Sequence, residues 1–349
     1  MTTATEPSPP PAGRSRLWGR VRPLLLVTAL ALGVALGLRL FVAEAFRIPT
    51  ASMEENLRVG DFLLVSKLHY GPRTPATLGL PFSERYLAGV TLPSLRLPGF
   101  AHVERGDVVV FNHPSERGPV ERRTPYIKRV AGLPGDTVSI TGKELRVGAE
   151  HTPLGPGMLA DWLVTVDAQP AFSLDRFGEA GVRHRPVREA EGLWRVRMTL
   201  GQAEAVAAWD AVLDLRPAIA EKDPLLFPAG TQQSLDAYGP VAVPKRGQTV
   251  QLDGATWPVL RDVIERHEGH TARRLADGRF EIDGEIVTAY TPEQDYYFVL
   301  GDNRDDSSDS RRWGFVPRDH LVGKAVLVYF SWDDEEGSPR FERIGRAIR

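Results

Sequence analysis

The chain of 349 residues contains no cysteine, and this absence removes several kinds of chemistry at once. Disulfide bonds, a thiol nucleophile and cysteine ligands for a metal are all excluded. The formal net charge of −2 at pH 7 gives no sign of a large basic surface, so nucleic acid is not expected as a partner. The compartment stays open, because an exported protein can fold without disulfides.

Clustered metal ligands are also scarce. The eight histidines are scattered along the chain, and the HExxH helix motif is missing. His267 and His270 stand close together in ERHEGH but have no obvious further ligand. We therefore expect no metal and no cofactor.

Long apolar runs are equally rare, and the exception lies near the N-terminus. LLLVTALALGVALGL (24–38) and LFVAEAF (40–46) provide about 20 residues that can span the hydrocarbon core of a bilayer. Arg39, near the far end, can snorkel to the headgroups. The sequence predicts one transmembrane anchor at residues 23–43 and no second span.

The charges around this run predict its orientation. The preceding tail, 1–22, begins with 13 residues rich in Pro, Ser and Thr, which indicates disorder, and continues with Arg14, Arg16, Arg20 and Arg22. By the positive-inside rule, this tail lies in the cytoplasm and the chain from about residue 44 lies outside. A cleavable secretory signal is the alternative, because Ala43-Glu44-Ala45 fits a cleavage site.

The rest of the chain has mostly the pattern of β-strands, and helical pattern is confined to 203–215 and 257–267. Short segments rich in β-branched or aromatic residues, with Gly, Asp or Pro at their edges, are typical of strands. They are FLLV (62–65), DVVVF (107–111), TVSI (137–140), YYFVLGD (296–302) and AVLVYF (325–330). We predict a mainly β fold: a twisted antiparallel β-sheet domain, split by a large insertion and preceded by a single transmembrane helix.

The insertion is expected at 141–290, between a first part of the β domain (44–140) and a second part with the C-terminal tail (291–349). It holds hairpin-like segments with Gly-containing turns and no catalytic pattern, so a passive cap on the sheet is favoured over a partner-binding role. The end of the tail, RFERIGRAIR (340–349), has apolar residues at helical spacing among arginines. It either touches anionic headgroups or closes the domain.

Three motifs follow one another along the chain: IPTASM (48–53), YIKRVAGLPGD (126–136) and GDNRDDSSDSRRWGFVP (301–317). A serine just outside a membrane span can attack peptide bonds that emerge from the bilayer, and a buried lysine that has lost its proton can act as its base. These segments resemble the type I signal peptidases, membrane-anchored Ser/Lys proteases that remove secretory signal peptides. The resemblance covers roughly 17–140 and 285–345.

The resemblance implies that Ser52 is the nucleophile of a serine endopeptidase and that Lys128 is its general base. Thr50 stands where the family has a Ser or Thr whose hydroxyl helps to form the oxyanion hole, with the Ser52 N–H as the second donor. Lys128 must be neutral to act as a base. Burial among apolar neighbours can lower the pKa of a lysine from its ordinary value of about 10.4.

The third motif supports the site. The resemblance implies that Ser307 hydrogen-bonds the lysine and orients its amine without adding a charge. The charged residues of this loop can pair into a network that fixes it, and the interleaved arginines oppose Ca²⁺. They are Asp302, Arg304, Asp309 and Arg311.

The implied substrates are preprotein signal peptides with small residues at the first and third positions before the cut. An extended substrate would pair with the strand beside Ser52 and place these residues in shallow apolar pockets. The implied walls are Phe46, Ile48, Leu57, Leu63, Val110, Tyr126 and Ile127. The other implied partners are the lipid bilayer and the secretion translocon. The implied location is the bacterial plasma (inner) membrane, where a membrane-embedded substrate favours a retained, single-pass anchor.

One departure from the family pattern stands beside the nucleophile. The family usually has Met-x-Pro-Thr-Leu, and here the segment is Met53-Glu54-Glu55-Asn56-Leu57, which adds a carboxylate near the site. Asn56 can still cap or hydrogen-bond locally. Two alternatives stay open: a specialised Ser/Lys peptidase of a secretion, conjugation or pilus system, and a catalytically silent membrane-tethered homologue. A self-cleaving repressor-type protease, another Ser/Lys hydrolase, fits the sequence less well. The repressor type normally carries a DNA-binding module, which residues 1–22 cannot form.

Overall fold

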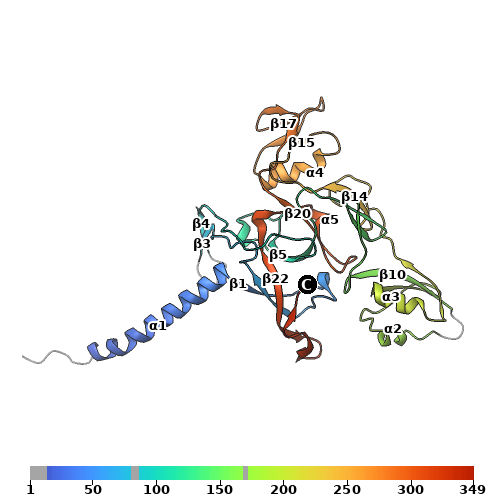
Figure 1. Ribbon diagram of the computed structural model, residues 1–349, viewed down its shortest axis with the longest axis horizontal. Coiled ribbons are helices and arrows are strands. Elements are labelled where there is room, and N and C mark those ends of the chain that lie inside the picture. Colours follow the sequence, from blue (N-terminus) through green and yellow to red (C-terminus); the bar gives the residue numbers. More distant parts are fainter. Residues whose placement is uncertain (1–13, 80–85, 168–171) are drawn as a thin grey trace, which may run out of the picture.

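The computed structural model describes residues 14–79, 86–167 and 172–349 (Figure 1). The expected disordered segment, 1–13, lies outside these ranges. The fold is mainly β, with several antiparallel sheets and one long N-terminal helix, as the sequence predicts.

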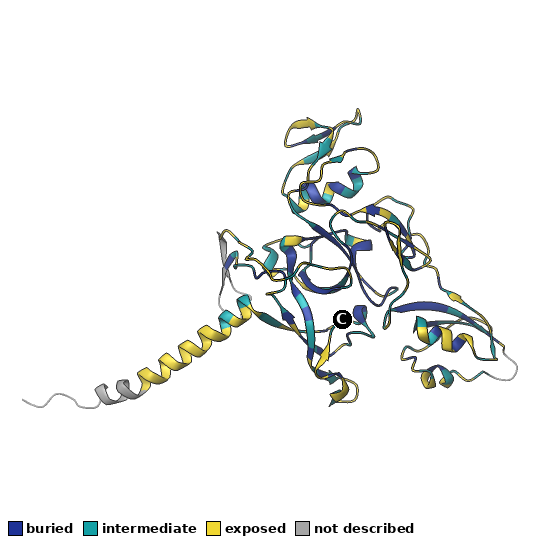
Figure 2. Ribbon diagram, in the orientation of Figure 1, coloured by how far each residue is buried: buried dark blue, intermediate teal, exposed yellow. Residues whose placement is uncertain are grey.

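The long helix α1 (Arg14–Phe41) points away from the body of the molecule (Figure 1). Its segment Val21–Phe41 is 21 residues long with a mean hydropathy of 2.3, and none of it is buried. At 1.5 Å per residue it measures about 31 Å, which matches a hydrocarbon core of about 30 Å. Figure 2 colours most of this helix as exposed, and many of its apolar residues are exposed, as expected of a membrane anchor. The helix begins earlier than the predicted anchor, and Ala43 already belongs to the first strand.

The described part of the chain contains a central sheet of nine strands, in which strands from the N-terminal part of the sequence pair with strands from the C-terminal part. The order is β1 (Ala43–Arg47), β2 (Asp61–Ser66), β22 (Leu321–Asp333), β5 (Val108–Asn112), β6 (Pro125–Gly132), β20 (Tyr296–Leu300) and β21 (Val316–Pro317), while β23 (Ser338–Pro339) and β24 (Arg346–Ala347) pair with β22. All pairs are antiparallel. Because β22 lies between β2 and β5, the central sheet is continuous only when this C-terminal strand is in place.

The apolar strands of this sheet are buried on both faces. In β5, Val108 and Val110 pack into one core cluster and Val109 and Phe111 into another, as the alternation of side chains in a strand requires. All five residues of β20 are buried as well. A strand covered on both sides reads as a continuous apolar run, which is why these segments could be found in the sequence.

Among the described residues, segment 141–290 contributes no strand to the central sheet. One sheet beside it contains β14 (Ala237–Ala242), β7 (Thr137–Thr141), β8 (Glu144–Val147) and β9 (Glu150–Thr152). A second contains β11 (Val187–Ala190), β12 (Leu193–Thr199), β10 (Leu159–Val166) and β13 (Val212–Pro217), with α2 (Asp175–Glu179) and α3 (Leu200–Ala207) packed nearby. The predicted helix at 203–215 is therefore only half right. It starts and ends earlier, and a strand follows from Val212.

The remaining elements are short. They are β3 (Thr77–Gly79), β4 (Tyr86–Thr91), β15 (Val250–Gln251), α4 (Trp257–Asp262), β16 (Ala272–Arg274), β17 (Phe280–Ile282), β18 (Glu285–Val287), β19 (Ala289–Tyr290) and α5 (Ser310–Trp313). Single turns of helix add Ala51–Met53, Val120–Arg122, Val263–His267, Arg318–His320 and Phe341–Arg343. The tail at 340–349 thus forms one turn and strand β24 on the sheet rather than a helix.

Candidate active site

Ser52 lies in a tight turn at the start of the β domain. Strand β1 ends at Arg47, and after an extended link the single helical turn Ala51–Met53 carries the serine. Met53 and Leu57 are buried in the core cluster beneath it, at 0% and 1% exposure. The apolar residues that follow Ser52 therefore hold the turn against the sheet, and the serine retains 9% of its surface. Thr50 is exposed beside it.

Lys128 lies in the middle of β6 and reaches this turn. Its Nζ lies 2.7 Å from Ser52 Oγ and 2.8 Å from the carbonyl oxygen of Ile127. The residue is only 3% exposed, and its Nζ lies 5.5 Å from the ring centre of Tyr126. Burial lowers the pKa of Lys128 from 10.5 to about 8, although the charges of Asp309 and Asp302 oppose the shift. A useful fraction of this amine is therefore neutral near neutral pH.

The turn that carries Ser52 is tied to the loop of the third motif by Asn303. The Asn303 N–H donates to the carbonyl of Ser52 over 3.1 Å, and its Nδ2 donates to the carbonyl of Ala51 over 3.2 Å. Asn303 is fully buried. Sequence reasoning did not single it out, although it stands inside the most distinctive segment of the chain.

Asp302, next to it, has its partners outside the loop of the third motif. Arg129 binds it with both ends of its guanidinium, Nε to Oδ1 over 2.8 Å and Nη2 to Oδ2 over 2.7 Å. Asn56 Nδ2 donates to the same Oδ2 over 2.7 Å. The prediction that Asn56 would bond locally is wrong, because its partner lies in the loop after β20. Among the described contacts, Arg304 forms no ion pair with Asp302. The buried Arg304 points its Nη2 at the sulfur of Met158, 3.2 Å away.

Asp309 and Arg311 pair as predicted. Arg311 Nε and Nη2 donate to the two carboxylate oxygens over 2.9 and 2.8 Å, and both side chains are buried. Burial alone would raise the pKa of Asp309, but the Arg311 charge and the hydrogen bonds from Arg311 and the Gly301 N–H hold it below its usual value. The loop therefore keeps an ionised carboxylate within the electrostatic reach of Lys128.

Ser307 is buried beside this carboxylate, where it helps to lower the pKa of Asp309. The hydrogen bond from Ser307 to Lys128 that the family resemblance implies is not formed. The Ser307 hydroxyl has no well-directed partner in the part of the chain that the structure describes. Gly301 allows the Ser52 turn and the loop that carries Ser307 to lie this close together. A Cβ on it would lie 2.2 Å from Ser307 Oγ and 2.6 Å from the Ser52 carbonyl oxygen.

The predicted pocket residues gather in one place, with one exception. Phe46, Ile48, Leu57, Leu63, Val110 and Ile127 belong to or pack against a single core cluster, whereas Tyr126 packs on the other one. Four of the seven are fully buried core residues: Ile48, Leu57, Leu63 and Val110. Only Phe46, Tyr126 and Ile127 keep partly exposed surface with which to touch a substrate.

The carboxylate added beside Ser52, that of Glu55, has a partner. Glu55 forms an ion pair with Arg58 over 3.1 Å, and the peptide bond between Glu54 and Glu55 is cis. Among the described residues, no three His, Asp or Glu side chains gather in a way that could hold a metal ion. The arrangement places the Ser52 hydroxyl against the buried Lys128 amine, so that the amine can accept the hydroxyl proton.

Comparison with known proteins identifies the family. The sequence model of the family described as "Signal peptidase, peptidase S26" matches residues 21–167 and 246–332, which is more than half of the chain. The Signal peptidase I of Pseudomonas aeruginosa is 29% identical over 327 residues, which cover 89% of this chain and 74% of that protein. The Signal peptidase I of Buchnera aphidicola is 28% identical over 319 residues, covering 88% and 77%. That of Aquifex aeolicus is 25% identical over 299 residues, covering 84% and 78%. The chain therefore belongs to the signal peptidase family, peptidase S26, whose members are serine endopeptidases.

Proposed function

We propose that this membrane-bound peptidase removes signal peptides through an acyl-enzyme on Ser52, with Lys128 as the general base. The observation that carries this proposal is the 2.7 Å contact between Lys128 Nζ and Ser52 Oγ at a buried position. A candidate base must lie within hydrogen-bond reach of the proton that it takes. A lysine whose pKa is lowered to about 8 can take that proton.

In the first step, neutral Lys128 takes the hydroxyl proton as Ser52 Oγ attacks the scissile carbonyl carbon. The carbonyl oxygen becomes an oxyanion, which the Ser52 N–H and the Thr50 hydroxyl stabilise. When the C–N bond breaks, the Lys128 ammonium gives its proton to the leaving amine. Water then attacks the ester in the same way, with Lys128 taking its proton and returning it to Ser52. No cofactor enters this sequence.

Asp302, Arg304, Asp309, Arg311 and Ser307 support the site in this proposal and do not react. Asp309 and Asp302 set the electrostatic environment of the lysine. The side chains of a bound signal peptide lie against Phe46, Tyr126 and Ile127, with the buried Ile48, Leu57, Leu63 and Val110 as the layer behind them. Shallow apolar walls of this kind favour small residues before the cut.

The anchor sets the location. We place α1 in the bacterial plasma membrane with the arginine-rich end in the cytoplasm, and the β domain (44–140 and 291–349) with its insertion (141–290) on the other side. The domain then stands where signal peptides leave the bilayer, within reach of the secretion translocon. The apolar exposed face of Val21–Phe41 supports this placement.

The test is cleavage of a preprotein with an Ala-x-Ala site by the detergent-solubilised protein. Ser52→Ala and Lys128→Ala are both expected to abolish cleavage, and Lys222→Ala, at an exposed lysine, serves as the matched control. Cleavage that survives Lys128→Ala would reject the assignment of the base. Failure of the wild type on several preproteins would favour a specialised peptidase or a silent homologue.

A further inference from the structure

Residues 155–161, here named the strap, lead from the first sheet of the insertion into β10 and run between the two catalytic loops. On one side Met158 forms an antiparallel bridge with Glu55, three residues after Ser52. On the other side Leu159 forms a parallel bridge with Asn303. The Leu159 N–H donates to the Asp302 carbonyl over 2.8 Å, and its own carbonyl accepts from the Arg304 N–H over 2.9 Å. The strap is thus the middle strand between the Ser52 turn and the loop that faces Lys128.

The far end of the strap is fixed by a buried ion cluster. The Asp161 N–H donates to Asp305 Oδ2 over 2.7 Å, and Asp305 Oδ1 accepts from Lys143 Nζ over 2.6 Å. Lys143 also binds Asp236 over 2.8 Å, and its side chain is 1% exposed. Leu159 is buried as well, at 1% exposure. Charges held at this depth need their partners, so the strap cannot shift without breaking the cluster.

Gly157 sets how closely the strap approaches the Ser52 turn. Its φ of +73° lies in the left-handed region, and a Cβ on it would lie 2.5 Å from Asn56 Oδ1. Asn56 is the residue whose Nδ2 reaches Asp302 over 2.7 Å. A glycine at 157 therefore leaves room for the Asn56 amide to span from one catalytic loop to the other.

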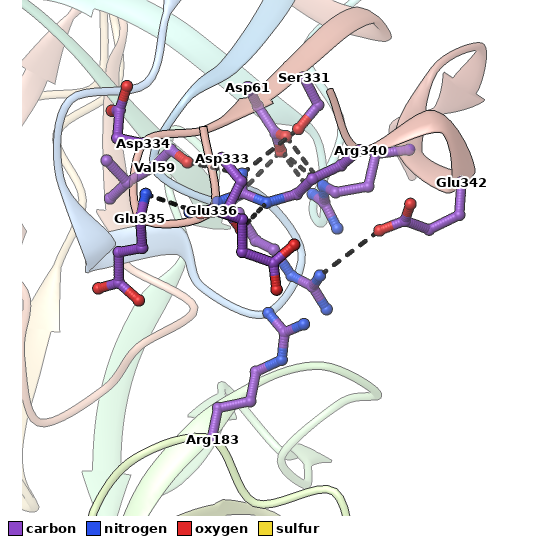
Figure 3. A network of polar contacts seen from close by, with 12 residues as sticks. Val59, Asp61, Arg183, Ser331, Asp333, Asp334, Glu335, Glu336, Arg340 and Glu342 are labelled. Atoms are coloured by element: carbon purple, nitrogen blue, oxygen red, sulfur yellow. Dashed lines mark hydrogen bonds and ion pairs between the residues drawn. The ribbon is translucent and has the colours of Figure 1, made fainter. Parts of the chain in front are cut away.

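The insertion contacts both residues at which the motif departs from the family pattern, Glu55 and Asn56, and also the neighbouring Glu54. Arg183 Nε lies 3.7 Å from Glu55 Oε1, and His184 Nε2 lies 3.8 Å from Glu54 Oε2. Asn56 Nδ2 lies 3.5 Å from the carbonyl oxygen of Pro156. Figure 3 shows Arg183 rising from the insertion toward the loops that carry Val59 and Glu342. The insertion and the altered motif therefore fit each other.

We infer that the strap positions the catalytic residues, with Gly157 and Asn56 as positioning residues that fix the Ser52 turn against the loop facing Lys128. The inference rests on the proposed function and assigns the insertion a part in it, in place of a passive cap. Displacement of a reacting group by about 1 Å can cost about a hundredfold in rate, even when the cause is remote. A change in the strap is therefore expected to act on kcat.

The experiment compares Gly157→Ala with Gly148→Ala in the full-length, detergent-solubilised protein. Gly148 also lies in the insertion at positive φ, +58°, but a Cβ on it has no atom within 4 Å. Both variants carry the backbone strain, and only Gly157→Ala pushes on Asn56. We expect kcat for preprotein cleavage to fall by about 10- to 100-fold in Gly157→Ala, with KM changed less than about threefold. Gly148→Ala should keep kcat within about twofold of the wild type.

Asn56→Ser supplies the second variant, because it shortens the side chain that Gly157→Ala would strike and removes the bond to Asp302. Alone it should lower kcat. The fall in kcat that Asn56→Ser causes should be smaller in the Gly157→Ala background than in the wild type, because the two changes disturb the same contact. A purely structural role would lower the unfolding temperature and leave kcat and KM of the folded protein unchanged.

The outcomes separate the two claims. A wild type that cleaves no preprotein would overturn the proposed function and this inference with it. An active wild type in which Gly157→Ala and Gly148→Ala have equal kcat would overturn the inference alone. If Gly157→Ala fails to fold, Asn56→Ser decides, and an unchanged kcat in that variant would reject the inference.

Discussion

Arg343 and Asp61 form a buried ion pair that joins the tail of the chain to the turn after Ser52. Arg343 Nε donates to Asp61 Oδ1 over 2.8 Å, and its Nη2 donates to the Asn56 carbonyl over 2.9 Å. The two residues are 2% and 0% exposed. Figure 3 shows Asp61 at the centre of a polar network that also contains Ser331 and Arg340. The tail therefore closes the domain, which was one of the two roles expected for it.

Replacing Arg343 by methionine should destabilise the protein. The change leaves the Asp61 carboxylate buried without its main counter-charge, which typically costs roughly 3–5 kcal/mol. Arg346→Met is the matched control, because Arg346 lies three residues further on and is exposed. Thermal unfolding of the two variants checks the prediction. Equal unfolding temperatures would show that the pair contributes little.

The rate of cleavage should rise with pH. Because Lys128 must be neutral and its pKa is lowered to about 8, kcat is expected to increase about tenfold per pH unit below that value and to level off above it. The measurement is kcat on a preprotein between pH 6 and pH 10, and a kcat that stays constant across this range would contradict the assignment.

Asp302→Asn should move this midpoint to lower pH. The negative charge of Asp302 raises the pKa of Lys128, so its removal favours the neutral amine. The amide keeps the shape of the side chain, although Arg129 loses its counter-charge. The profile of kcat against pH checks the direction. A shift to higher pH would mean that the altered loop, rather than the lost charge, controls the lysine.

The sequence indicated that Ser52 and Lys128 belong to one candidate site, and it indicated the strands nearby, but it did not indicate the contacts between distant segments. Lys128 and Ser52 stand in motifs, and β5 and β20 are continuous apolar runs. The bonds of Asn303 to the Ser52 turn join residues about 250 positions apart, and no local pattern specifies them. The same holds for the pairing of Asp302 with Arg129. The prediction of a helix at 203–215 is wrong in its second half, because Val212–Pro217 pairs with β10 and this pairing overrides the local helical preference.

The helix α1 should remain in the mature protein and act on membrane-borne substrates. Mass spectrometry of protein extracted from membranes is expected to find residues 14–41, and a mature chain that begins at Phe46 would instead identify a cleaved signal. A variant lacking residues 1–41 should cleave a short soluble peptide at nearly the normal rate. Its rate on a preprotein held in vesicles should fall roughly tenfold or more, because anchoring raises the effective concentration. Equal losses on both substrates would mean that α1 supports the fold.

Lys128→Met should give an inactive protein that is more stable than the wild type at pH 7. The pKa of Lys128 falls from 10.5 in the unfolded chain to about 8 in the folded protein, so its burial opposes folding by up to about 3 kcal/mol at neutral pH. Methionine fills a similar volume without a charge. Between pH 8 and pH 10.5 the unfolded chain binds more protons than the folded one, so the stability of the wild type rises with pH through this window. The advantage of Lys128→Met is therefore complete below about pH 8 and lost by about pH 10.5. Unfolding midpoints at pH 7 and pH 10, with Lys222→Met as the exposed control, measure it. A variant less stable than the wild type at pH 7 would show that Lys128 contributes to the fold as well as to the chemistry.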